Sequence, residues 1–73
     1  MTEKQKRELR ARISSRIAEA RTRSEMTLEV LSEKSGIQAA HIERIEKGKY
    51  TPPLEVLESI AQALGMKVDI TKR

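Results

Sequence analysis

Residues 27–48, TLEVLSEKSGIQAAHIERIEKG, predict two short helices joined by a turn of only a few residues. Thr27 suits the N-cap of the first helix, because its hydroxyl can accept from backbone N–H groups one turn further on. Gly36 ends this helix, since a residue without a Cβ adopts the left-handed conformation at low cost. Gly48 ends the second helix in the same way, so the two helices can pack closely against each other.

Apolar side chains hold the two helices together. Leu31, Ile37, Ile42 and Ile45 recur at helical spacings, and Ser32 is small where the second helix should cross the first. Such a pair is a helix-turn-helix, a motif whose second helix enters the major groove of DNA. The stretch therefore predicts double-stranded DNA as the partner and residues 39–47 as the recognition helix.

The composition bounds the size and the class of the protein. Seventy-three residues allow a single domain, residues 1–73, with a small core. Residues 1–23 hold eight Lys and Arg against three Glu, a net charge of +5, whereas the remaining residues hold seven against eight, a net charge of −1. A basic segment suits a polyanion, although a solvated helix face rich in Lys and Arg fits the charge equally well.

Several classes of protein are disfavoured by residues that the sequence lacks. There is no cysteine, hence no disulfide framework or thiolate metal site, and no apolar run long enough to span a bilayer. We expect no membrane association, no metal, no cofactor and a cytoplasmic location. A single Tyr without Phe or Trp disfavours stacking on single-stranded nucleic acid. His41 is the only histidine, so we expect no enzyme and assign it a flanking or phosphate role.

Two further helices and one strand are expected around the central pair. Residues 2–24 predict a long helix with Leu9, Ile13, Ile17 and Ala20 on one face, a capping box at Thr2, and a basic extension over residues 1–12. A loop with two prolines at residues 49–53 precedes a periodic helix over residues 54–64. Residues 66–71 alternate apolar and polar side chains after Gly65, which predicts a short strand.

These residues resemble the Cro and phage-repressor type of helix-turn-helix, also called Xre-like. The resemblance covers residues 13–66 and implies a mainly α fold: a four-helix Cro/repressor-like helix-turn-helix domain, here with a short C-terminal β-strand. The strand replaces the usual fifth helix and looks more like the antitoxin branch of the family. The matching positions are Leu28, Ser32, Gly36, Ile42, Ile45, Glu46, Lys47, Gly48, Pro52, Leu54, Leu57, Ile60, Ala61, Leu64 and Gly65.

The side of the second helix opposite Ile42 and Ile45 is the predicted reading face. Arg44 can bond guanine O6 and N7 together, and Glu43 can accept from a cytosine amino group. Ala40, with Ala39 at the margin, offers only a contact with a thymine methyl, although relatives often carry longer polar readers there. Gln38 either pairs with an adenine edge or caps its own helix.

Other positions are expected to fix the protein on the DNA or to hold the fold. Helix ends and the following loop supply phosphate contacts, from Thr27, Lys47, Lys49 and Tyr50. The family resemblance also implies a salt bridge at the positions of Arg21 and Glu46, between the first helix and the recognition helix.

A lone strand needs a partner, and the simplest partner is the same strand of a second copy. Centring an antiparallel pair on Val68 sets Lys67 opposite Asp69, so we predict homodimerisation through Lys67, Val68, Asp69 and Ile70. Two functions follow. The first is a sequence-specific transcriptional regulator that binds a palindromic operator as a homodimer. The alternative is an antitoxin or bridging module whose main task is to bind a toxin or other partner protein.

Overall fold

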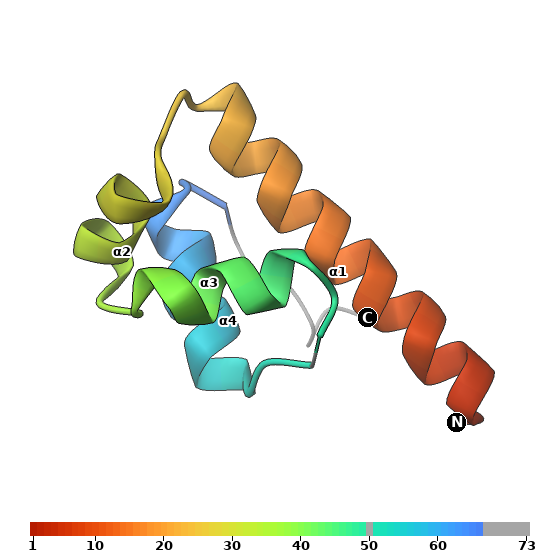
Figure 1. Cartoon of the computed structure of the whole chain (residues 1–73). Coiled ribbons are helices and arrows are strands. Elements are labelled where there is room, and N and C mark those ends of the chain that lie inside the picture. Colours follow the sequence, from red (N-terminus) through yellow and green to blue (C-terminus); the bar gives the residue numbers. More distant parts are fainter. Residues whose placement is uncertain (50, 67–73) are drawn as a thin grey trace.

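The computed structural model describes residues 1–49 and 51–66, which form four helices (Figure 1). These are α1 (Glu3–Arg23), α2 (Leu28–Ser35), α3 (Ala39–Glu46) and α4 (Leu54–Ala63). The predicted four-helix arrangement is confirmed. The bounds differ from the predictions by one residue at some ends, and α3 stops at Glu46 because Lys47 is its C-cap.

Side-chain caps fix where the first two helices begin. The Thr2 hydroxyl accepts from the backbone N–H of Gln5 at 3.1 Å, and the Gln5 side chain accepts from the N–H of Thr2 at 2.9 Å, which is a complete capping box. The Thr27 hydroxyl accepts from the N–H of Val30 at 3.1 Å. Gly36 ends α2 with a φ of +77°, where a Cβ would be strained. The turn between α2 and α3 is therefore tight, as predicted.

One small core joins the helices. α2 packs against both α3 and α4, and α1 packs against α3. The side chains that form its centre are aliphatic and almost inaccessible to solvent, and Ile37 lies at its edge. These buried residues are Ile17, Leu31, Ile42, Ile45, Ile60 and Ala61.

Only the C-terminal half of α1 belongs to this core. Residues 1–9 are all exposed, and the helix continues past the other elements toward the N-terminus (Figure 1). Leu9, which was expected on the packed face, is 38% exposed and does not pack against the buried core. Ile17 is buried and Ile13 packs against the core, as predicted, and the buried stripe also includes Ser14 and reaches Arg21. The basic extension of residues 1–12 is thus a helix with little tertiary packing.

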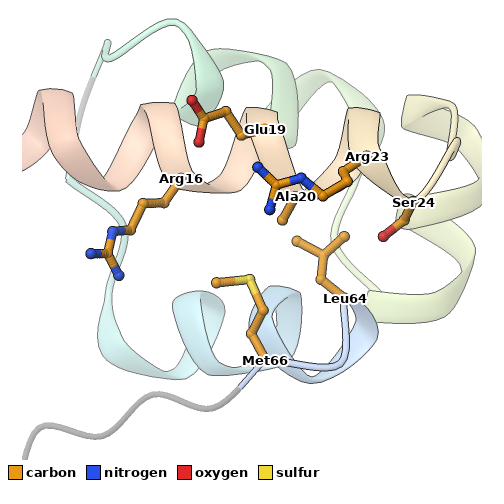
Figure 2. A pocket seen from close by; sticks show the side chains of 7 residues that line it. All are labelled: Arg16, Glu19, Ala20, Arg23, Ser24, Leu64 and Met66. Carbon is orange, nitrogen blue, oxygen red and sulfur yellow. The ribbon is translucent and has the colours of Figure 1, made fainter.

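The described chain ends at Met66, just after α4. The N–H of Met66 donates to the carbonyl of Ala61 at 2.7 Å, which closes the end of the helix around Gly65. The described residues contain no strand, and all of the predicted strand except Met66 lies outside them. Ala20 of α1 faces Leu64 and Met66 across an open pocket, with Arg16 and Arg23 at its sides (Figure 2).

Candidate nucleic-acid interface

The second helix of the pair, α3, has one buried and one exposed side. Ile42 and Ile45 are fully buried, whereas Ala40, Glu43 and Arg44 are exposed. This division follows from the helical period, because residues separated by three or four positions share a side. Ala39, which was assigned to the margin of the reading face, is half-buried. The proposed readers therefore lie on the surface of α3, opposite the core.

Gln38 precedes α3 as its N-cap residue, but its side chain makes no capping hydrogen bond. The alternative in which Gln38 is occupied by its own backbone is therefore absent from the structure. The side chain is exposed and lines a shallow pocket with Ala40, His41 and Arg44. Because Ala40 is short, the longer side chains around it leave a recess on the exposed side of α3.

Glu43 and Lys47 form an ion pair one turn apart on α3. The Lys47 ammonium lies 3.2 Å from the Glu43 carboxylate, and both side chains are about half exposed. The two residues were predicted to have separate tasks and their pairing was not predicted, although Glu followed by Lys four positions later is the favourable helical order. An exposed pair contributes only about 0–1 kcal/mol, so DNA groups can compete for either partner.

The expected phosphate contacts lie at the ends of helices. Thr27 is exposed at the N-terminus of α2, where the first N–H groups of a helix have no acceptor within it. Lys49 is exposed directly after α3, and its backbone N–H donates to the carbonyl of Arg44 at 3.0 Å. Tyr50 lies outside the described residues. Thr27 and Lys49 are thus both accessible to solvent at helix ends.

Arg21 and Glu46 connect α1 to the end of α3. The guanidinium donates twice to the carboxylate, through Nε at 2.6 Å and Nη2 at 3.0 Å, and a third bond reaches the carbonyl of Met26 at 2.9 Å. The side chains are only 20% and 11% exposed. Two parallel bonds between planar groups are stronger and more directional than a single contact. The salt bridge that the family resemblance implied is present.

The hydrogen bond with Glu46 raises the pKa of Arg21 above its ordinary value. Burial opposes this increase, and the negative charges of Glu46 and Glu29 add to it. A raised pKa stabilises the fold at every pH below the pKa of the unfolded arginine, and the stabilisation is lost only as the pH rises through the folded value. Both values lie far above neutrality. Titration of Arg21 therefore gives no pH dependence of stability near neutral pH.

Ser14 is a second connection between α1 and α3, which sequence analysis missed. Its buried hydroxyl lies 2.7 Å from the carbonyl of Ile45 and 2.8 Å from that of Arg10. The signal was a small polar residue in line with Ile17 and Arg21 on the helical period. Ser14 and Arg21 together fix the end of α3 against α1.

Two absences bear on other kinds of site. In residues 1–49 and 51–66, no group of three or more metal-binding side chains could hold an ion. The part of the chain that the structure describes also has no helix long and apolar enough to cross a membrane.

The tight turn, the buried contact of α2 with α3 and the exposed outer side of α3 define a helix-turn-helix protein. The chain belongs to the Cro and phage-repressor type of helix-turn-helix family: the family model described as Helix-turn-helix, HTH_3, matches residues 17–70. An uncharacterised HTH-type transcriptional regulator of Archaeoglobus fulgidus is 37% identical over 54 residues, which cover 74% of this chain and 76% of that protein. No solved structure gives a significant match.

Proposed function

We propose that this chain is a sequence-specific transcriptional regulator that binds a palindromic operator as a homodimer, with α3 in the major groove. One observation carries the proposal. The outer side of α3 presents Gln38 and Arg44 to solvent, while the inner side is fixed by buried Ile42 and Ile45. A rigid helix with exposed hydrogen-bonding side chains suits direct readout of base edges. The family and the name of the Archaeoglobus fulgidus relative support a regulatory role.

Each side chain on the outer side of α3 has a distinct task. Arg44 donates to O6 and N7 of a guanine, and Gln38 bonds an adenine edge. The recess over Ala40 accepts a thymine methyl, with Ala39 at its margin. Glu43 accepts from a cytosine amino group only after its ion pair with Lys47 breaks. Because that pair is exposed and weak, the base can replace Lys47.

Phosphate contacts orient the helix in the groove. Thr27 and the N-terminus of α2 bind one phosphate group, and Lys47, Lys49 and Tyr50 bind the backbone beyond the other end of α3. These contacts fix the register without reading sequence. Lys47 is released for this task when Glu43 turns to a base.

A second copy completes the site. One eight-residue helix contacts few base pairs, and two copies related by a two-fold axis read two half-sites one DNA turn apart. We assign the contact between copies to residues 66–71, centred on Val68, with Lys67 opposite Asp69 and Ile70 on the same face as Val68. This assignment rests on the alternating sequence alone.

Selection of duplexes from a random library tests the function. The proposal predicts enrichment of a palindrome whose half-sites lie about 10 base pairs apart, centre to centre. Binding that is abolished by salt and enriches no sequence would reject specific readout and favour the alternative of a partner-binding module.

A further inference from the structure

A basic cleft lies between the N-terminal half of α1 and the end of α3. Arg7 and Arg10 line the α1 wall with Ala11, Ser14 and Ser15, and the other wall is formed by Glu46, Lys47 and Gly48. The family model matches residues 17–70, so the α3 side of this cleft lies within the matched region and the α1 side lies before it. The α1 side belongs to the basic extension and its junction with the core.

The two arginines in this cleft form no ion pair with any residue that the structure describes. Neither Arg7 nor Arg10 has a carboxylate oxygen within 4.0 Å in the described part of the chain. The carboxylate that lines the cleft, that of Glu46, is held by two bonds from Arg21 and is 11% exposed. The carboxylate that lines the cleft is therefore paired with Arg21 and forms no ion pair with Arg7 or Arg10.

The arginines are also not needed to cap α3. Backbone carbonyls in the last turn of α3 already have donors. The carbonyl of Ile45 accepts from the Ser14 hydroxyl at 2.7 Å and from the N–H of Gly48 at 3.0 Å. The carbonyl of Arg44 accepts from the N–H of Lys49 at 3.0 Å. Cationic side chains often satisfy such carbonyls, but these are already bonded. The guanidinium groups remain available to an external anion.

The extension holds these charges beyond the core. Arg7 lies seven residues before Ser14, about 10 Å further along the helix axis. Residues 1–9 are exposed, yet a complete capping box at Thr2 starts the helix. The C-terminal end of α3 lies beside α1 (Figure 1). The cleft includes Lys47 at this end of α3, where the proposed function needs contacts with the DNA backbone.

We propose that this cleft binds backbone phosphate groups of duplex DNA, next to the base pairs that α3 reads. The inference rests on the proposed function, because it takes the orientation of the DNA from α3. Arg7 and Arg10 give charge-assisted hydrogen bonds to phosphate oxygens on one wall, and Lys47 contributes from the other. The extension is thus a second, sequence-independent contact with the same duplex.

The test is the salt dependence of binding to a mixed-sequence duplex of about 30 base pairs, three helical turns. The double variant Arg7→Ala with Arg10→Ala is compared with Arg12→Ala with Arg16→Ala. The control removes the same charge from residues that do not line the cleft. Alanine favours helix, and circular dichroism checks that both variants keep their helical content.

We expect the Arg7/Arg10 variant to lower the salt slope by about 2 and to weaken binding on the order of 50-fold at about 0.1 M salt. The control should retain the wild-type slope. Equal losses of affinity in both variants, or an unchanged salt slope in the Arg7/Arg10 variant, would overturn the proposed phosphate contact in the cleft. Either result would leave the proposed function intact. A wild-type chain that binds neither this duplex nor any duplex selected from a random library would overturn both proposals.

Discussion

Arg21 contacts both ends of the central helix pair. Its guanidinium bonds the Glu46 carboxylate at the end of α3 and the Met26 carbonyl just before α2. The carboxylate thus holds the exposed side of α3 in a fixed orientation relative to α1. We therefore expect this partly buried pair to affect DNA recognition through the orientation of α3, without touching DNA itself.

Glu46→Ala should lower the free energy of unfolding by about 2–4 kcal/mol, because it leaves the largely buried Arg21 with one carbonyl partner. Urea denaturation measures this loss. Glu43→Ala is the matched control, since it breaks an exposed pair on the same helix and should cost about 0–1 kcal/mol. Equal costs for the two variants would mean that the Arg21–Glu46 pair contributes no more than a surface contact.

At the scale of the helices, sequence predicted what local chemistry determines. Thr2 and Thr27 marked helix starts and Gly36 a helix end, because caps involve residues only a few positions apart. The bond from Ser14 to the carbonyl of Ile45 was not predicted, since it depends on how α1 crosses α3. For the same reason the recess over Ala40 and the cleft at Arg7 were not predicted: both are shapes made by several side chains after packing.

The two threonine caps should differ in their effect on stability. Thr27→Ala leaves the N–H of Val30 without its acceptor, in a helix that packs in the core. The free energy of unfolding should therefore fall by about 1 kcal/mol. Thr2→Ala should reduce helical content without moving the urea midpoint, because residues 1–9 are exposed. Thr27→Ser serves as the control that keeps the hydroxyl. A midpoint that falls as far in Thr2→Ala would show that the extension packs on the core.

At the scale of the whole molecule, the proposed readout of a palindrome requires a second copy of the chain. We expect truncation after Met66 to give a monomer in sedimentation and to weaken binding of the operator. This end point keeps the hydrogen bond from Met66 to Ala61 that closes α4. Thermal melting checks that the truncated chain stays folded. A truncated chain that remains dimeric would assign the interface to the helices. The pocket between Ala20 and Leu64 would then be the first candidate for that interface (Figure 2).

The central claim is that the outer side of α3 reads bases, and Arg44 tests it most directly. The measurement is the ratio of affinities for the selected palindrome and for random duplex, in wild type and in Arg44→Ala. We predict that the variant loses about 1–3 kcal/mol on the palindrome only, and that selection with it loses the preference for guanine at one position in each half-site. An equal loss on both duplexes would contradict the claim, because Arg44 would then contact only phosphate.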